Sequence, residues 1–403
     1  MNNSALKGVR VADFGHVMAG PYCSMLLSTL GAEVIKIETR TRPDEQRAQH
    51  GGGDVADLES NSNFFEVNLN KMSVTINLTT EKGKALARQI VATSDVVVEN
   101  MRPGVMDKLG LGYKDLVKIK PDIIMLSLSG FGQTGPLRAY SAYNPCFTSY
   151  GGLAHLTGYG EKKPNTMNNS GGDARAGNSG VFSVLMALNM RQRTGQGQYI
   201  DQSSCEVINS MIGDQMMDYA MNQRSPKRTG NHDAVMAPHN CYRCEGNDAW
   251  ISIAVANETE WQALCAVLGN PEWTREEAFS SALSRWHNQK RLDVLIEAWT
   301  VSHDAYDLMH RLQAAGVAAM PSMKAEQLFT DPHTVAREAV MEVEHPVLGV
   351  RKTITPPWKM SATPPTIHHT APLIGEHNDY VFKELLGLSA REIATLTEER
   401  VIY

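Results

Sequence analysis

The chain of 403 residues has few cysteines, no excess of positive charge and no long apolar run. Six cysteines in a chain of this length are too few for a disulfide framework. The 38 lysines and arginines are outnumbered by 44 aspartates and glutamates, and a net charge of -6 argues against a surface for nucleic acid. No stretch approaches the ~18 uninterrupted apolar residues of a membrane span, and residues 1–14, MNNSALKGVRVADF, lack the apolar core of a signal peptide. We therefore expect a cytoplasmic enzyme that does not enter a membrane.

Cys241 and Cys244 are the only cysteines close together in the sequence. A redox or zinc role for this pair would need a βαβ context or a second pair of ligands, and neither surrounds it. We interpret both as small buried residues of a hairpin strand, and we expect no metal site.

The sequence alternates strand and helix patterns over its first half, which predicts a mainly parallel sheet covered on both faces. Strand patterns occupy residues 9–14, 33–38, 73–78, 95–100, 122–129 and 197–203, and helix patterns occupy residues 21–30, 80–93, 113–119, 177–193 and 203–221. The last of these helices is rich in methionine, and we interpret Met211, Met216, Met217 and Met221 as core residues.

A polar, basic stretch that begins at Asn222, NQRSPKR, suits a linker between domains. A hairpin pattern and three helix patterns follow it. The length also exceeds what one hydrophobic core usually supports. We expect an α/β protein with a discontinuous, Rossmann-like large domain, residues 1–222 and 330–403, and a small α+β domain, residues 223–329.

Residues 130–135, GFGQTG, have the glycine spacing of a dinucleotide-binding turn. Such a turn needs a helix directly after its last glycine and an acidic residue about 20 positions further on. Here Pro145 interrupts the following stretch, and no Asp or Glu occurs from Pro136 to Gly160. The glycines therefore indicate a loop with positive φ angles, and we expect no NAD or FAD site.

Five segments, in order along nearly the whole chain, resemble the class III CoA-transferases, the family of formyl-CoA transferase, carnitine CoA-transferase and the benzylsuccinate CoA-transferases. They are residues 6–38, 95–113, 126–137, 171–203 and 371–389. The resemblance implies that two chains form an interlocked dimer, either a homodimer or a heterodimer with a related subunit. It also implies that coenzyme A and acyl-CoA are substrates and that no cofactor is bound permanently.

The family's catalytic aspartate precedes a long helix that ends in a T-G-x-G turn, and Asp173 occupies that place here. By its position alone, an aspartate at a helix start is usually an N-cap. The resemblance implies instead that Asp173 attacks the donor thioester, which keeps the acyl energy in a mixed anhydride. Attack by CoA thiolate then gives an aspartyl-CoA thioester, from which the acceptor acid takes the CoA.

The resemblance also implies which residues contact CoA. They are His16, Met18, Arg40, Asn100, Arg102, Lys108, Tyr143 and Asn144. The three cations among them suit the phosphates of CoA. Without the resemblance, Arg40, Arg102 and Lys108 would be interpreted as ordinary solvated charges, and His16 as a structural histidine.

Departures from the family's patterns bear on the substrate. Formyl-CoA transferase has glutamine where Met18 stands, and its glycine-rich loop has no counterpart in residues 224–240, which argues against formyl or oxalyl specificity. We expect succinyl-CoA as donor and an aromatic or dicarboxylic acceptor such as benzylsuccinate, because Met18, Tyr143 and Tyr150 could form an apolar wall.

Two other functions fit the same fold. One is a 2-methylacyl-CoA racemase, but such racemases carry a histidine base where this chain has Tyr143 and Asn144. The other is a poorly catalytic partner subunit of a heteromeric CoA-transferase, and the presence of Asp173 argues against it.

Overall fold

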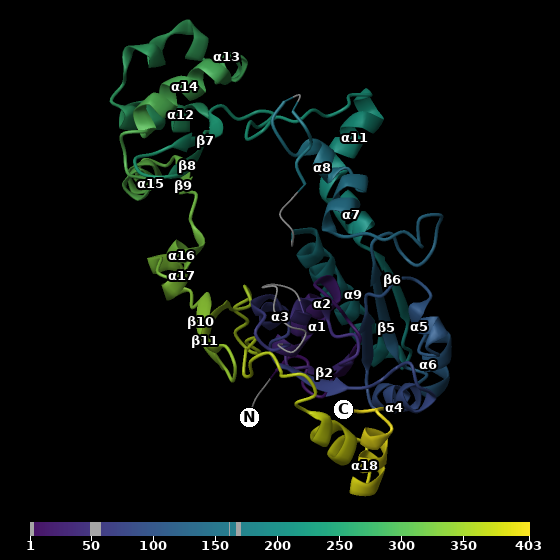
Figure 1. Ribbon diagram of the computed structural model, residues 1–403. Helices are drawn as coiled ribbons and strands as arrows, with labels where there is room; N and C mark the ends of the chain where they lie inside the picture. Colours follow the sequence, from purple (N-terminus) through teal and green to yellow (C-terminus); the bar gives the residue numbers. More distant parts are fainter. Residues whose placement is uncertain (1–3, 49–57, 161, 167–170) are drawn as a thin grey trace. The chain divides into compact units, whose positions relative to one another are not determined.

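The computed structural model describes residues 4–48, 58–160, 162–166 and 171–403 (Figure 1). The chain divides into two compact units. The first comprises Met1–Ala154, Thr166–Arg224 and His333–Tyr403, and the second comprises His155–Asn165 and Ser225–Pro332.

A six-stranded parallel sheet forms the centre of the first unit, in the order β3-β2-β1-β4-β5-β6. Its strands are β1 (Arg10–Asp13), β2 (Glu33–Glu38), β3 (Lys71–Thr75), β4 (Val96–Glu99), β5 (Ile124–Ser129) and β6 (Tyr199–Ser203). This is the strand order of the Rossmann fold, so the predicted α/β class and Rossmann-like sheet are confirmed. The order reverses direction between β1 and β4, and ligands of such sheets bind beyond the carboxyl ends of the strands at that point.

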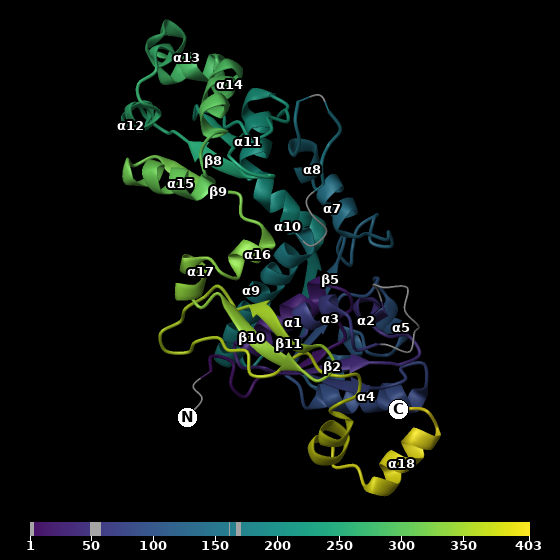
Figure 2. The same cartoon turned by 60° about the vertical axis from the view of Figure 1, so that its left-hand side comes forward.

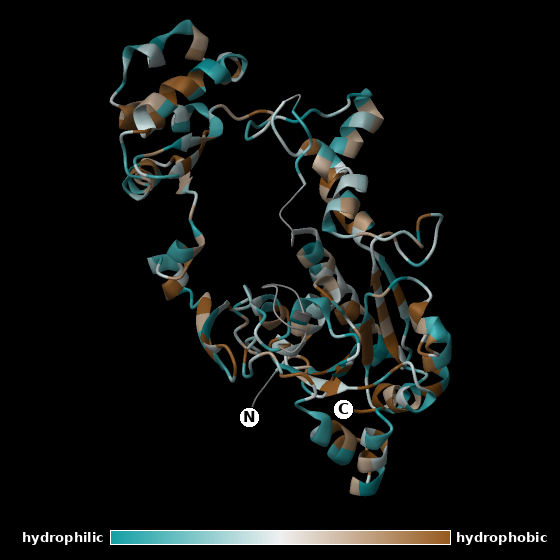
Figure 3. Cartoon of the chain, viewed as in Figure 1, coloured by the Kyte–Doolittle hydropathy of each residue, from teal (hydrophilic) through white to brown (hydrophobic). Residues whose placement is uncertain are grey.

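Helices cover both faces of this sheet because neighbouring strand residues point to opposite sides. Val11 and Ile124 pack into one core cluster with residues of α1 (Ala19–Thr29) and α9 (Gly171–Thr194). Ala12 and Met125 pack into a second cluster on the other face, with residues of α4 (Glu81–Ala92). Figure 3 shows the hydrophobic β5 beside helices of mixed hydropathy.

Shorter elements complete the first unit. They are α2 (Glu45–Ala48), α3 (Ser62–Val67), α5 (Val105–Lys108), α6 (Tyr113–Ile119), α7 (Asn144–Tyr150), α10 (Ser204–Asn209), η1 (Ser210–Ile212), α11 (Gly213–Asn222), the antiparallel pair β10 (Val340–His345) and β11 (Gly349–Ile354), the π-helix η4 (Tyr380–Leu385) and α18 (Ala390–Glu398). Two further helices, α8 (Leu153–Leu156) and α17 (Pro332–Ala336), each cross a boundary between the units. Figure 2 shows the β10–β11 pair clearly. The outer edge of β3 is covered by the C-terminal segment, where Asn378 accepts the Thr75 amide at 2.9 Å.

The second unit is an α+β fold around a three-stranded antiparallel sheet in the order β7-β8-β9. Its elements are β7 (His239–Arg243), β8 (Trp250–Ala254), α12 (Glu258–Leu268), η2 (Glu272–Arg275), η3 (Glu277–Phe279), α13 (Ala282–His287), α14 (Gln289–Thr300), α15 (Ala305–Ala314), β9 (Ala318–Pro321) and α16 (Ala325–Leu328). Cys241 and Cys244 are free thiols at β7. Only Cys244 is buried, so the prediction of two buried cysteines is wrong for Cys241, which lies partly exposed on the strand.

The methionines predicted to lie in the core are not buried. α11 has no buried residue, and Met211, Met216, Met217 and Met221 are all exposed. The core interpretation was therefore wrong, because helical spacing identifies an apolar face without saying what covers it.

Candidate active site

The turn between β1 and α1 lies at the point where the strand order reverses. Asn100, directly after β4, holds this turn from the neighbouring strand. Its side-chain oxygen accepts the His16 amide at 2.8 Å, and its side-chain nitrogen donates to the His16 carbonyl at 2.8 Å. Burial lowers the pKa of His16, although Asp44 opposes this shift, so its imidazole is neutral at neutral pH. The structure therefore brings His16, Met18 and Asn100 together at the crevice expected for a ligand.

Buried charges lie beneath this turn. Asp13 accepts the Gly15 amide at 2.8 Å and pairs with Lys71 at 2.9 Å. Lys36, in the middle of β2, donates to the Gly15 carbonyl at 2.7 Å and pairs with Asp44 at 3.0 Å. Burial alone would raise the pKa of Asp44, but Lys36 lowers it to about 2. Burial lowers the pKa of Lys71 to about 8 in spite of Asp13.

These buried charges are not among the residues predicted from the sequence, although one signal for them is present. A lysine stands in the middle of the apolar strand EVIKIE, and a fully buried lysine needs a partner.

Asp173 lies in the first turn of α9, where burial raises its pKa to about 6. Glycines bring α9 close to α1: a Cβ on Gly177 would lie 3.0 Å from the Ala19 carbonyl oxygen, and one on Gly180 would lie 3.0 Å from the Cys23 sulfur. Asp173 is one turn before Gly177, on the same face of α9.

Asn144 supports Asp173 by capping α9. Its side-chain oxygen accepts the Gly172 amide at 2.8 Å, and a Cβ on Gly172 would lie 2.3 Å from that oxygen. Only glycine fits there. Tyr143, next to it, is 64% exposed at the start of α7. The cap fixes the backbone on which Asp173 stands.

The loop GFGQTG follows β5 and leads to no helix before α7. Gly132 and Gly135 have φ angles of 82° and 80°, as the expected loop requires. Asp201, in β6, accepts the Gln133 amide at 2.8 Å and anchors the loop. The loop thus lies at the carboxyl end of β5, on the same edge of the sheet as the turn of His16.

The predicted cations follow strands at this edge. Arg40, after β2, is exposed and donates to the Ile374 carbonyl at 3.1 Å. Arg102, after β4, is exposed and donates to the Ser141 hydroxyl. Lys108, at the end of the short α5, is also exposed. Since the strands are parallel, Arg40 and Arg102 share the edge that carries His16 and Asn100.

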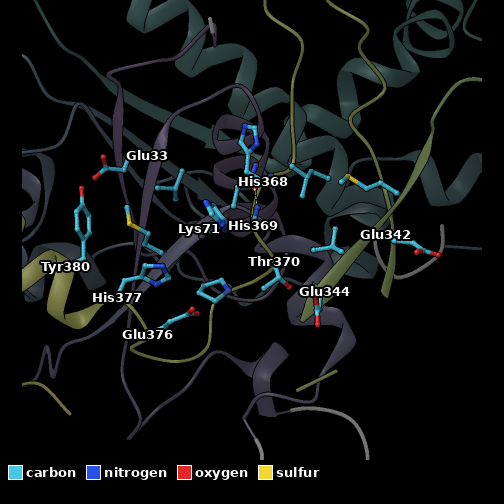
Figure 4. A pocket seen from close by; sticks show the side chains of 17 residues that line it. Glu33, Lys71, Glu342, Glu344, His368, His369, Thr370, Glu376, His377 and Tyr380 are labelled. Carbon is cyan, nitrogen blue, oxygen red and sulfur yellow. Dashed lines mark hydrogen bonds between the residues drawn. The ribbon is translucent and has the colours of Figure 1, made fainter. Parts of the chain in front are cut away.

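A cavity of about 740 Å³ lies elsewhere in the first unit, beside β3 and the β10–β11 pair (Figure 4). It contains none of the predicted site residues. Its lining mixes four glutamates with Lys71 and three histidines, so it has no single sign of charge. It contains the first residues of β2 and β3, Glu33 and Lys71, and therefore lies at the opposite edge of the sheet from the predicted site.

Among the residues that the structure describes, no group of three or more His, Cys, Asp or Glu side chains could hold a metal ion. Within the same ranges, no helix is long and apolar enough to cross a membrane.

Comparisons with known proteins find relatives along nearly the whole chain. The model of "CoA-transferase family III" matches residues 6–378. A succinyl-CoA–D-citramalate CoA-transferase of Chloroflexus aurantiacus is 34% identical over 400 residues, covering 98% of each chain. The beta subunit of a succinyl-CoA–L-malate CoA-transferase of the same organism is 32% identical, again covering 98% of each. The crystal structure of a CAIB/BAIF family protein from Brucella suis superposes with a TM-score of 0.87 at 32% identity, covering 95% of this chain and 100% of that one.

Proposed function

The chain belongs to CoA-transferase family III, and we propose that it moves CoA from succinyl-CoA to a dicarboxylic acid by way of Asp173. The observation that carries this proposal is a partly buried aspartate at the start of α9, one turn before the glycine that lies against α1. We infer that its carboxylate faces the turn of His16, at the reversal of the sheet. A CoA-transferase needs a nucleophile at this place that is shielded from water, because an exposed anhydride would hydrolyse.

The chemistry balances without a cofactor. The Asp173 carboxylate attacks the thioester carbonyl, the C–S bond breaks, and CoA leaves as a thiolate. The thiolate attacks the aspartyl carbonyl of the anhydride, which releases succinate and leaves an aspartyl-CoA thioester. The acceptor carboxylate attacks this thioester and displaces the thiolate, which then attacks the acceptor carbonyl and restores the free Asp173 carboxylate.

CoA binding is proposed along the shared edge of the sheet. Arg40, Arg102 and Lys108 supply positive charge for its phosphates. His16, Met18 and Asn100 border its reactive end, and Tyr143 and Asn144 close the far side. Because the Asn144 oxygen accepts the Gly172 amide, and neither residue is a histidine, neither takes the role of the racemases' histidine.

A four- or five-carbon dicarboxylate is the proposed acceptor. The relatives' names pair succinyl-CoA with D-citramalate and L-malate, and donor and acceptor are then close in size and charge. Phe131 and Tyr150, in edge-to-face contact at 5.4 Å, offer an aromatic surface that would also suit benzylsuccinate.

A panel of acceptors tests this function. The protein is incubated with succinyl-CoA and, in turn, L-malate, D-citramalate, benzylsuccinate, oxalate and acetate, and each new CoA thioester is measured by mass spectrometry. We expect transfer to at least one of the first three acids and little to acetate. Absence of any acyl-CoA product, or exchange of an α-proton of a 2-methylacyl-CoA with deuterium in its place, would refute the proposal.

The acid limb of the activity should follow Asp173. Burial raises its pKa to about 6, and only the carboxylate attacks, so kcat/KM should fall about tenfold for each pH unit below 6 and level off above it. The profile is measured from pH 4.5 to 8 with succinyl-CoA. A His16→Asn variant should keep the same limb. If kcat/KM did not fall between pH 6 and pH 5, or if the fall disappeared in that variant, the titrating group would not be Asp173.

An apolar face of α9 is exposed, and we propose that a second chain covers it. Phe182, Met186 and Met190 lie four residues apart along α9 and are 66%, 56% and 47% exposed, and the methionines of α11 are exposed as well. Monomers rarely leave such a face uncovered. We propose a homodimer, or a heterodimer with a related subunit.

Sedimentation of the pure protein tests the assembly. We expect a mass of two chains at micromolar concentration, and a Phe182→Glu/Met186→Glu variant should sediment as one chain. Val294→Glu, at an equally exposed site in the second unit, serves as control and should remain dimeric. A wild-type monomer under these conditions would contradict the proposal of a homodimer.

A further inference from the structure

Polar side chains hold the three backbone amides of residues 15–17. The amides of Gly15, His16 and Val17 all donate to side chains, of Asp13, Asn100 and Asp44 respectively, at 2.8 to 3.0 Å. Val17 has a φ of 64°, in the left-handed region that a β-branched residue rarely adopts. Such a conformation persists only where its surroundings impose it.

Asp44 is the residue that imposes it. The side chain is fully buried between β2 and α2, and one oxygen accepts the Val17 amide at 3.0 Å. The other oxygen pairs with Lys36, whose ammonium also donates to the Gly15 carbonyl. The pair therefore binds two backbone groups of the turn, the Val17 amide and the Gly15 carbonyl. It also links the turn to the segment after β2, which carries Arg40.

We propose that Lys36 and Asp44 are positioning residues for acyl-CoA: they hold the turn of His16 and Met18 in the shape that receives the thioester, without touching it. This inference rests on the proposed function. Replacing a buried ion pair with apolar residues of similar volume is often neutral for stability, so stability alone does not explain why an ion pair is present here. A role in shaping the site explains it.

The test removes the pair as a unit, so that no buried charge is left alone. In the Lys36→Met/Asp44→Leu variant we expect KM for succinyl-CoA to rise about 10- to 100-fold while kcat changes less than about threefold, since the reacting carboxylate is untouched. The matched control is Glu38→Leu/Arg47→Met. That pair is equally buried and lies 2.8 Å apart, and its carboxylate also accepts the Ser73 hydroxyl, but it makes no hydrogen bond to the turn. Its KM should stay within about twofold of wild type.

A second-site change sharpens the test. Adding Val17→Gly to the Lys36/Asp44 variant should restore part of the KM, because glycine adopts a positive φ without help from Asp44. Amide exchange in the peptide covering residues 14–20, followed by mass spectrometry, should be at least tenfold faster without the pair and unchanged in the Glu38/Arg47 control.

Three results would overturn the inference: an unchanged KM in a folded Lys36/Asp44 variant, an equal rise in the control, or unchanged amide exchange in the turn. If the wild-type protein transfers no CoA, the proposed function fails, and the exchange measurement still decides whether the pair shapes the turn.

Discussion

Replacing Asp173 with asparagine should lower kcat for CoA transfer by at least about 10³-fold, equivalent to about 4 kcal/mol of transition-state stabilisation. Asparagine keeps the shape of the side chain but cannot form the anhydride. Because the substitution leaves the turn of His16 and the cap by Asn144 intact, the affinity for CoA itself should stay within about threefold. Initial rates with succinyl-CoA and the best acceptor, together with calorimetric binding of CoA, measure both quantities.

The control is Asp214→Asn. Asp214 also lies in the first turn of a helix, α11, but it is exposed and outside the site, so its substitution should leave the rate unchanged. Retention of more than about a tenth of the wild-type rate by Asp173→Asn would remove Asp173 from the reaction.

The free energy of unfolding of Asp173→Asn shows whether its loss of activity comes from the chemistry or from misfolding. The folded-state pKa of Asp173, about 6, lies above its ordinary value of 3.8, so the protein gains stability when this carboxyl is protonated and loses it as the pH rises through 6. Asparagine does not carry the buried charge. The variant should therefore be more stable than wild type at pH 8, by up to about 3 kcal/mol, and the difference should vanish below about pH 4.

Asp13→Ala should lower the free energy of unfolding of the first unit by about 3–5 kcal/mol. The carboxylate of Asp13 is inaccessible to solvent, pairs with Lys71 at 2.9 Å and accepts the Ser24 hydroxyl at 2.7 Å. Its removal leaves a buried ammonium without its nearest anion and frees the Gly15 amide. Urea unfolding, followed by circular dichroism, measures the loss.

Glu33→Ala provides the comparison on the neighbouring strand. The Glu33 pair with Arg10 at 2.8 Å is partly solvated, with side chains 33% and 23% exposed, and such pairs contribute about 1 kcal/mol or less. If Asp13→Ala cost no more than Glu33→Ala, the buried charges would not be holding the edge of the sheet that carries the site.

The sheet could be predicted from the sequence because its strands are short apolar runs separated by helix patterns, and this alternation fixes a parallel topology with few alternatives. The charges beneath the site could not. Lys36 meets Asp13 through the parallel register of β2 on β1, and Asp44 reaches Lys36 from a segment without any periodic pattern. Pairings of this kind depend on tertiary contacts, which local sequence does not encode.

Asp173 shows a different limit. Its position at a helix start gave no reason to prefer catalysis over capping, and its assignment as the nucleophile came from the family resemblance. The structure adds what the sequence could not express: α1 and α9 approach through glycines on the face of α9 that carries Asp173. The exposed methionines of α11 show that an apolar helix face predicted from the sequence need not lie in the core of its own chain. Such a face can also be covered by a second chain.

The covalent intermediate on Asp173 tests the mechanism most directly. The protein is mixed with succinyl-CoA in the absence of an acceptor, quenched, digested and examined by mass spectrometry. We predict that the peptide containing Asp173 carries the mass of CoA as a thioester, and that hydroxylamine converts it to the hydroxamate. An unmodified Asp173 peptide from a preparation that transfers CoA once an acceptor is added, or an adduct on another residue, would contradict the account.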